Sequence, residues 1–493
     1  MGFLLVGTYI IKSKKKVYGL NKVRKNYLYN LVYQVITLFL PLITIPYVSR
    51  VLGADGIGVY SYTKSTVTYF TAFANFGIHL YGQREIAYYQ YSEELQIKTF
   101  LELFSIHVIT TGASFAFYLI FLLYSTEYRM VYYLQIPTIM AALFDIAWYY
   151  QGLENYKYTV IRNIYIKIAG LFCIFIFVKT KEDLGVYIFC LSVIALLANL
   201  SLWSQVIRKI KKYKGPKLEI RKHGKAILAL YIPQVIIQLY TVFDKTMLGI
   251  LGQSLAESGY YEQAEKIARL AASIVSALSA VMMPRISNLY AEGKMEQAYL
   301  EIKHSFQFVW FMGIPIMFGL IGVSKEFIAI FLGSGYEKTA VVLSVFSVIV
   351  IMAGLNNVTG LQYFIPMGGQ KKFTISVCVG ALVDIIMNLI LIPQFKAVGA
   401  AISIVLAEMA ITMVQFYYIN QTIAVRKILV CAWKYILSGV IMLIVVGKVS
   451  APIYIMPRLI IKVIVGIFVY FSMLFLLKDK MIYQEGKKLF FSK

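Results

Sequence analysis

Residues 184–206 read L-G-V-Y-I-F-C-L-S-V-I-A-L-L-A-N-L-S-L-W-S-Q-V, a run of 23 residues without one charged side chain. A helix needs about 20 apolar residues to cross the hydrocarbon core of a bilayer, so this run predicts a membrane span. The 493-residue chain is 59% hydrophobic and 15% charged, whereas soluble domains carry about 25% charged residues. The composition excludes a water-soluble globular fold and predicts an all-α polytopic membrane protein.

Runs of this kind recur along the whole chain, separated by short polar or Gly/Pro-containing breaks. They predict about fourteen transmembrane helices, at 27–48, 58–80, 100–123, 130–151, 159–178, 184–206, 226–250, 258–283, 304–324, 339–363, 373–393, 397–418, 428–447 and 456–477.

The Lys and Arg residues behind the net charge of +24 are distributed unequally between alternate connections of these spans. Connections on the side of the N-terminus hold 32 Lys and Arg, and connections on the opposite side hold 8. Because cytoplasmic loops of membrane proteins are enriched in Lys and Arg, both termini are predicted to be cytoplasmic. Most of the positive charge therefore encodes orientation and contact with an anionic inner leaflet, and no nucleic-acid partner is expected.

The longest basic connection, 207–225, divides the predicted spans into two halves. A weak repeat supports this division: L-G, a polar loop and G-x-Y follow both the first span and the seventh. Six spans per half give both halves the same orientation in the membrane. The predicted parts are a basic cytoplasmic segment 1–26, an N-lobe 27–206, the linker 207–225, a C-lobe 226–418, two extra helices within 428–477 and a basic cytoplasmic tail 478–493.

Several classes of activity are not supported. The four cysteines lie in apolar stretches without C-x-x-C spacing, which favours neither disulfides nor a metal site. No G-x-x-x-x-G-K-[ST] phosphate loop occurs, which argues against a built-in ATPase. The predicted outer connections are too short to hold an acceptor substrate, which disfavours a membrane glycosyl polymerase. We therefore expect a transporter without catalytic residues, metal or bound cofactor.

Charged side chains inside the predicted spans are the candidate functional residues, because a charge facing lipid costs at least about 2.5 kcal/mol. The cations are Lys64, Lys167, Lys245, Lys266, Arg269, Lys434, Arg458 and Lys462. Among the acids are Asp145, Asp244, Glu262, Glu265, Asp384 and Glu408. Together they predict a wet interior.

Two readings stay open for the cations. Lys64 lies about 9 Å along the second span, where it either binds an anion in a cavity or extends to the outer headgroups. Asp244 and Lys245 are adjacent and point about 100° apart, so at least one of them is expected to face the space between the halves. The alternative is an inter-helix salt bridge with Lys64 or Asp145.

Acids at mid-depth in the spans are candidates for ion coupling. Asp384 and Asn388 lie one turn apart, and Glu408 is in the next span. Buried carboxylates can exchange protons with cavity water, so coupling to H⁺ or Na⁺ through Asp145, Asp244, Asp384 or Glu408 is one hypothesis. Structural pairing is the other.

Several passages resemble the polysaccharide biosynthesis flippases, the Wzx-type exporters of lipid-linked repeat units. These passages are I-P-Y-V-S-R-V-L-G-A-D-G-I-G-V-Y-S at 45–61, D-I-A-W-Y-Y-Q-G-L-E-N at 145–155, F-D-K-T-M-L-G at 243–249, G-Y-Y-E-Q-A-E-K-I at 259–267 and M-P-R-I-S at 283–287.

The resemblance implies the fold of multidrug and toxin extrusion transporters and lipid II flippases, with two six-helix lobes around an inward-opening central cavity plus two extra helices. It implies a substrate, an oligosaccharide repeat unit on undecaprenyl pyrophosphate, that crosses to the outer leaflet of a bacterial cell membrane by alternating access. By position, Arg50, Lys64, Arg84 and Lys245 could bind its pyrophosphate or sugar.

Two alternatives share the fold: a multidrug/cation antiporter and a flippase of the peptidoglycan precursor lipid II. Polysaccharide polymerase and glycosyltransferases are the expected protein partners.

Overall fold

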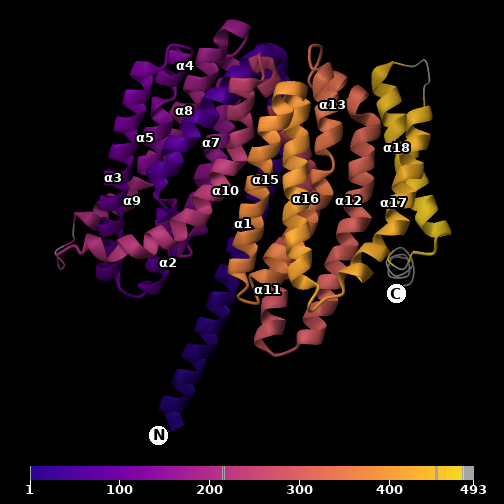
Figure 1. Cartoon of the computed structure of the whole chain (residues 1–493). Helices are drawn as coiled ribbons and strands as arrows, with labels where there is room; N and C mark the ends of the chain where they lie inside the picture. Colours follow the sequence, from indigo (N-terminus) through magenta and orange to yellow (C-terminus); the bar gives the residue numbers. More distant parts are fainter. Residues whose placement is uncertain are drawn as a thin grey trace. The chain divides into compact units, whose positions relative to one another are not determined.

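The computed structural model describes residues 2–211, 213, 215, 217–449, 454–479 and 481. All regular elements among these residues are helices (Figure 1). In the first half of the chain they are α1 Gly2–Asn75, α2 Ile78–Tyr88, α3 Glu93–Tyr124, α4 Arg129–Leu134, α5 Ile136–Phe144, α6 Ala147–Gly152, α7 Tyr156–Phe177, η1 Lys181–Asp183, α8 Leu184–Ser201, α9 Trp203–Ile210, η2 Ile220–His223 and α10 Gly224–Leu251. In the second half they are α11 Leu255–Ala291, α12 Met295–Phe331, α13 Glu337–Phe346, α14 Ile349–Asn357, η3 Val358–Phe364, α15 Gln370–Phe395, α16 Ala397–Ile419, α17 Val425–Lys448 and α18 Ile455–Leu476.

The helical fold class is confirmed, and every predicted span falls on one or more of these helices. Within the described residues, twelve helical stretches are long and apolar enough to cross a membrane. Predicted spans 27–48 and 58–80 both fall on α1 and its continuation, and 226–250 coincides with α10, which is not among the twelve. The count of fourteen therefore stays a prediction.

The chain divides into two compact units. The N-terminal unit comprises Met1–Val51 and Thr66–Gln238, and the C-terminal unit comprises Leu52–Ser65 and Leu239–Lys493. α1 contributes to both, and it is broken at Gly53, whose φ of 69° is in the left-handed region that favours glycine. The lobe boundaries predicted from the sequence stay a prediction.

The predicted span 130–151 is interrupted within the N-terminal unit. α4, α5 and α6 replace one continuous helix, with breaks at Gln135 and at Asp145–Ile146. Asp145 has an extended backbone, and its Oδ1 accepts a hydrogen bond from the Ala147 N–H at 3.0 Å. A short polar side chain that bonds to the following backbone competes with helix continuation, which explains the second break.

The core of the N-terminal unit is aromatic. Trp148 of α6 is fully buried and its ring stacks on Phe100 of α3 at a centroid distance of 5.4 Å. A Cβ atom on Gly82 of α2 would lie 2.5 Å from the Trp148 ring. The passage D-I-A-W-Y-Y-Q-G thus places a large ring against a glycine, so that α2 and α6 can approach closely.

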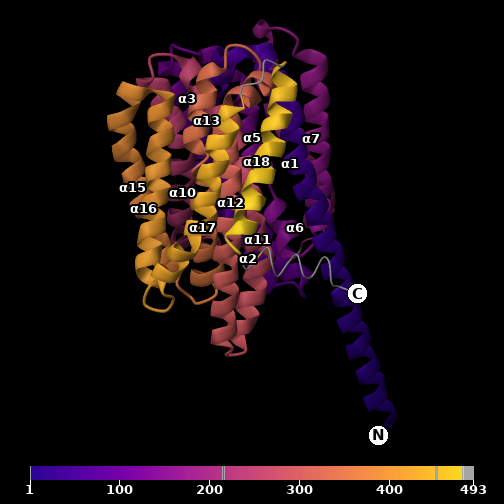
Figure 2. The same cartoon turned by 90° about the vertical axis from the view of Figure 1, so that its right-hand side faces the viewer.

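In the C-terminal unit, α15 and α16 lie side by side along their length (Figure 1 and Figure 2). α17 and α18 pack on each other and on α12. α11 and α12 each have 37 residues, which is roughly 55 Å of helix. Both helices therefore extend well beyond a hydrocarbon core of about 30 Å.

A close helix contact joins the two repeated passages inside the C-terminal unit. A Cβ atom on Gly58 of α1 would lie 1.7 Å from the Leu255 carbonyl oxygen, and one on Gly259 of α11 would lie 2.1 Å from the Ala54 oxygen. The two backbones touch here because neither glycine has a side chain. Gly58 and Gly259 are therefore required by this helix crossing.

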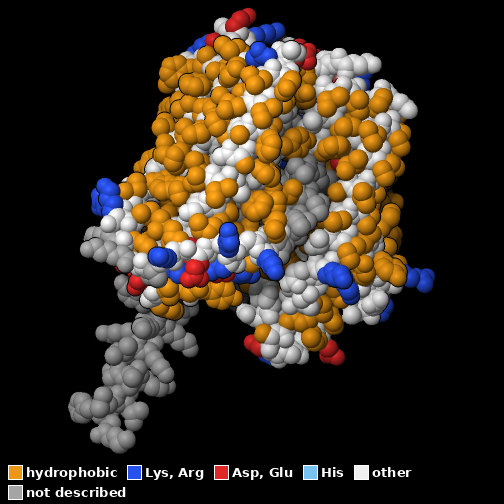
Figure 3. Space-filling view, turned by 60° about the vertical axis from the view of Figure 1, so that its left-hand side comes forward, with side chains coloured by type: hydrophobic (Ala, Val, Ile, Leu, Met, Phe, Trp, Pro, Cys, Tyr) orange, Lys and Arg blue, Asp and Glu red, His pale blue; other side chains and the backbone are white. Residues whose placement is uncertain are grey.

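The exposed surface of the helices is largely apolar. Exposed side chains include Phe39, Met413, Tyr417 and Phe468. Figure 3 shows hydrophobic side chains over most of the visible face, with Lys and Arg mainly in a band across its lower part and at its top. Such a surface suits contact with lipid and identifies a multi-pass membrane protein.

Candidate functional site

A group of six charged side chains, here called the charge cluster, lies inside the C-terminal unit. Its centre is Lys245 of α10, whose Nζ is 2.6 Å from Glu262 Oε2 and 2.9 Å from Glu265 Oε2 of α11. Lys266 Nζ lies 2.9 Å from Glu262 Oε1, and Arg269 Nε lies 2.6 Å from Glu265 Oε1. Both carboxylates are almost fully enclosed, so each depends on these cations for its stability.

The spacing of residues 262–269 explains how one helix supplies most of the cluster. Glu262 and Lys266, and likewise Glu265 and Arg269, are four residues apart and therefore neighbours on the helix surface. Glu262 and Glu265 are three apart and share the face towards α10. The sequence identifies Lys245 as a candidate because it lies inside a predicted span. It does not identify the glutamates that bind Lys245, because that pairing depends on the register between α10 and α11.

Lys64 of α1 is the sixth member of the cluster. Its Nζ lies 5.3 Å from the centre of the Tyr60 ring, and its charge interacts with those of Glu262 and Lys245. One turn earlier, the Ser61 hydroxyl donates to Glu262 Oε2 at 3.0 Å. Lys64 is exposed, unlike Glu262. The structure thus brings two of the four predicted cations, Lys64 and Lys245, into one site.

The other two predicted cations belong to the N-terminal unit. Arg50 lies exposed on α1. Arg84 lies on α2, where its guanidinium is 5.2 Å from the centre of the Tyr81 ring and its Nη2 is 3.3 Å from Glu85. Neither belongs to the charge cluster.

A second buried polar group, the carboxyl pair, is formed by Asp244 of α10 and Asp384 of α15. Asp244 is 2% exposed and accepts hydrogen bonds from the Tyr261 hydroxyl and from Asn388 Nδ2, the latter at 2.7 Å. Asp384 is fully buried, and its charge interacts with that of Asp244. Two enclosed neighbouring carboxyl groups are stabilised when a proton or a cation lies between them.

The two remaining predicted acids have direct partners. Glu408 of α16 accepts from Asn356 Nδ2 at 2.5 Å, and Asn356 Oδ1 in turn accepts from the Thr412 hydroxyl at 2.7 Å. In the N-terminal unit, Asp145 Oδ1 lies 3.5 Å from Arg162 Nη1. Asp145 therefore pairs with Arg162 of its own unit. The salt bridge left open from the sequence joined Asp244 or Lys245 to Lys64 or Asp145, whereas Lys245 here pairs with Glu262 and Glu265.

Another buried ionic group in the N-terminal unit carries no sequence signature. Glu102 of α3 is fully buried, and its Oε2 lies 2.9 Å from His223 Nε2 and 3.0 Å from Lys222 Nζ. Its Oε1 accepts from the Glu219 backbone N–H at 2.7 Å, while His223 Nδ1 is 2.8 Å from the Tyr81 hydroxyl. These bonds fasten the end of the linker to α2 and α3, which fixes where α10 begins.

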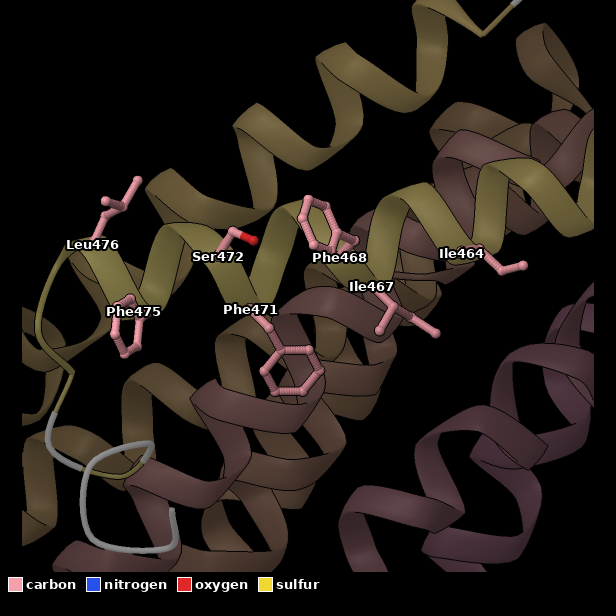
Figure 4. Close-up of a pocket in the computed structure, with 7 residues that line it drawn as sticks. All are labelled: Ile464, Ile467, Phe468, Phe471, Ser472, Phe475 and Leu476. Atoms are coloured by element: carbon pink, nitrogen blue, oxygen red, sulfur yellow. The ribbon is translucent and has the colours of Figure 1, made fainter. Parts of the chain in front are cut away.

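An apolar pocket lies along α18 (Figure 4). Its volume is about 780 Å³, and six of its seven lining residues, from Ile464 to Leu476, are apolar. The close-up shows the rings of Phe468, Phe471 and Phe475 along one helix. Such a surface suits a hydrocarbon chain. Within the described residues, no group of three or more His, Cys, Asp or Glu side chains could hold a metal ion.

These features define a multi-pass membrane protein with paired charges enclosed among its helices. The chain belongs to the polysaccharide biosynthesis protein family, whose model matches residues 23–290. The model of the lipid II flippase MurJ matches residues 160–475. The family resemblance stated from the sequence is confirmed.

Relatives and solved structures agree with this assignment. An O-antigen transporter of Escherichia coli strain K12 is 24% identical over 83% of this chain and 98% of its own length. A low-salt glycan biosynthesis flippase of Haloferax volcanii is 25% identical over 38% of this chain and 39% of its own.

Among solved structures, lipid II flippase MurJ in an inward closed conformation has a TM-score of 0.73 at 19% identity, covering 92% of this chain and all of that one. An inward-facing multidrug resistance MATE family transporter has a TM-score of 0.59 at 14% identity, covering 84% of this chain and 96% of that one. The predicted fold relationship to both groups is confirmed.

Proposed function

We propose that this protein is a flippase that carries undecaprenyl-pyrophosphate-linked oligosaccharide repeat units from the cytoplasmic to the outer leaflet for cell-surface polysaccharide synthesis. The family and the relatives named for O-antigen transport and glycan flipping support this proposal. The observation that carries it is the charge cluster.

The composition of the cluster suits a pyrophosphate. Four cations and two carboxylates leave it with a formal excess of two positive charges. A pyrophosphate diester carries one negative charge on each phosphate, as other phosphodiesters do. Lys64 and Arg269 are the exposed members and are placed to meet the substrate first, whereas Lys245 is held between the two glutamates.

The rest of the path is proposed from the sequence positions. Arg50 and Arg84 of the N-terminal unit would bind phosphate or sugar oxygens at other stages of transport. The polyprenyl chain would stay in lipid, and the apolar pocket on α18 has the chemistry to receive it. Rocking of two lobes would then expose the site to each leaflet in turn.

Coupling to H⁺ or Na⁺ would involve the carboxyl pair. Asp244 and Asp384 are both enclosed and their charges interact, and Asp244 is next to Lys245 in the sequence. Loss or gain of a cation there changes the charge beside α10, which also carries the centre of the cluster. Asp145, which lies 3.5 Å from the Arg162 guanidinium, and Glu408, which accepts a hydrogen bond from Asn356, are the other candidates.

The test uses purified protein in liposomes that contain a fluorescent undecaprenyl-pyrophosphate oligosaccharide. Transfer between leaflets is measured by the accessibility of the label to an added quencher. Lys64→Ala and Lys245→Ala should each lower the rate at least tenfold, whereas Lys371→Ala, a change at an exposed lysine, should not. Equal rates in all four proteins would refute the proposal. Imposed pH and Na⁺ gradients test ion coupling in the same vesicles. Transfer rates that do not change with either gradient would refute the coupling hypothesis.

Lipid II is a second candidate substrate, because the MurJ model matches residues 160–475. Lipid II shares the pyrophosphate and the polyprenyl chain, so the two substrates should be compared in the same vesicles. A multidrug/cation antiporter is the other alternative. Unchanged surface polysaccharide with altered drug tolerance in the Lys64→Ala and Lys245→Ala strains would favour it.

We further propose a bacterial inner membrane location with both termini cytoplasmic. A reporter that fluoresces only in the cytoplasm, fused to the C-terminus, tests the orientation. The substrate would leave this protein chemically unchanged, so glycosyltransferases must make it and a polymerase must use it.

A further inference from the structure

A pocket of about 420 Å³ lies in the C-terminal unit between the start of α12, the turn after α16 and the start of α17. Lys303 from α12 and Lys427 from α17 both line it. Both side chains are exposed, and neither forms an ion pair among the residues that the structure describes. Glu296 is the one acidic residue of the lining, so the pocket has a net positive charge.

The inner wall of this pocket is aromatic. Phe306 and Trp310 of α12 line it, and both are almost completely buried. Trp310 is 6% exposed, and its indole N–H has no hydrogen-bonding partner in the described part of the chain. A buried N–H without a partner costs free energy, and an occupant with acceptor oxygens could supply one.

The start of α17 adds positive potential to the same place. This helix has 24 residues and begins beside the pocket, and its N-cap residue, Ala424, has no side chain able to cap it. The first backbone N–H groups of a helix attract anions. The Val425 N–H is satisfied by Asn420 Oδ1 at 3.2 Å, which leaves the lysines as the main source of attraction.

The position of the pocket indicates where its occupant comes from. Its lining residues fall at the connections 284–304 and 420–427, both predicted to be cytoplasmic, and at the helix ends next to them. From there α17 continues with exposed apolar side chains at Leu429, Val430 and Trp433. On this predicted topology, a cationic hollow next to a lipid-facing helix is expected at the level of the inner-leaflet headgroups.

We propose that this pocket binds the phosphate headgroup of an anionic phospholipid of the inner leaflet, with the acyl chains lying along α17. The headgroup supplies an anion between Lys303 and Lys427, and the chains cover apolar side chains that the fold leaves exposed. This inference does not rest on the proposed function. Two lysines near an anionic surface should favour the anionic lipid about thirtyfold over a zwitterionic one.

The test is quenching of tryptophan fluorescence in the full-length protein by lipids with brominated acyl chains. Trp310 in the wall and Trp433 on α17 report on lipid at this site. Brominated phosphatidylglycerol should quench at far lower mole fraction than brominated phosphatidylcholine. The double variant Lys303→Gln/Lys427→Gln should lose this difference, and the control Lys371→Gln should keep it.

Several outcomes would overturn the proposal. Equal quenching by the two lipids in the unmodified protein would do so without any variant. A difference that survives in the double variant, checked for its helical content by circular dichroism, would also do so. If millimolar inorganic phosphate abolishes the preference, the pocket is an anion site open to free phosphate and not a lipid site.

Discussion

The contact between Gly58 and Gly259 allows a direct test of how closely two helices must approach. In Gly259→Ala, the new Cβ atom would lie 2.1 Å from the Ala54 carbonyl oxygen. Real Cβ atoms essentially never come within 3.0 Å of such an atom. Because the opposing atom belongs to the backbone, no side-chain rotation relieves the clash, and α1 and α11 must move apart by about 1 Å.

The expected cost follows from this displacement. Forcing an extra methyl group into a packed interior costs about 1–3 kcal/mol, which lowers the midpoint of thermal unfolding by roughly 2–4 °C per kcal/mol in domains of 150–250 residues. The same cost would disfavour any conformation in which this contact is closed. The equilibrium constant for reaching that conformation falls tenfold for each 1.4 kcal/mol. We therefore expect Gly259→Ala to lower both the unfolding midpoint and the transport rate.

The assay compares Gly259→Ala with Gly319→Ala, in which the same methyl group on α12 would meet nothing within 4 Å. Thermal unfolding is followed by tryptophan fluorescence in detergent, and transport by restoration of surface polysaccharide in a strain that lacks the gene. Gly319→Ala should be neutral or slightly stabilising, because alanine favours helix more than glycine does. If the two variants are equally stable and equally active, the helix crossing is not close-packed as described.

Three further predictions concern buried contacts. Lys462 Nζ of α18 lies 2.6 Å from Glu326 Oε1 of α12. Lys462→Met should therefore lower the free energy of unfolding by about 3–5 kcal/mol, and the double variant Lys462→Met/Glu326→Met should recover most of this loss. A double variant no more stable than the single one would contradict this. Gly82→Val should unfold at lower temperature because its side chain would overlap the Trp148 ring, with Gly112→Val, at a position open to space, as the matched control. Asp384→Asn should keep the fold but change the response of transport to pH or Na⁺, and an unchanged response would separate the carboxyl pair from coupling.

The span pattern could be predicted because it depends on the length of apolar runs, which is visible in the sequence. The break at Asp145 could not, because one side chain bonding to the Ala147 N–H decides it against an otherwise apolar run. Similarly, Glu102 lies in a predicted span without any periodic signal. Besides Lys98, four residues earlier, its ion-pair partners are Lys222 and His223, more than one hundred positions later in the chain.

The candidate site was predicted in part. Depth in the membrane singled out Lys245 and Lys64, and the structure places both in the charge cluster. The glutamates that hold Lys245 are visible in the sequence as in-span acids, but their pairing depends on which faces of α10 and α11 meet. The repeated glycine passages likewise predicted two related halves, whereas their direct contact at Gly58 and Gly259 appears only in three dimensions.

The pairing inside the charge cluster also bears on how a flippase could release its cargo. A site of unpaired cations would bind pyrophosphate tightly in a poorly hydrated interior and would let it go slowly. Here the carboxylates of Glu262 and Glu265 already bind the Lys245 ammonium, at 2.6 and 2.9 Å. If the protein has the proposed function, a substrate phosphate must compete with these two carboxylates for that ammonium. Substrate binding then exchanges one set of ion pairs for another, and the carboxylates re-form theirs as the substrate leaves. An exchange of this kind keeps the buried charges paired in both states, which a transporter needs because an unpaired buried charge is strongly destabilising.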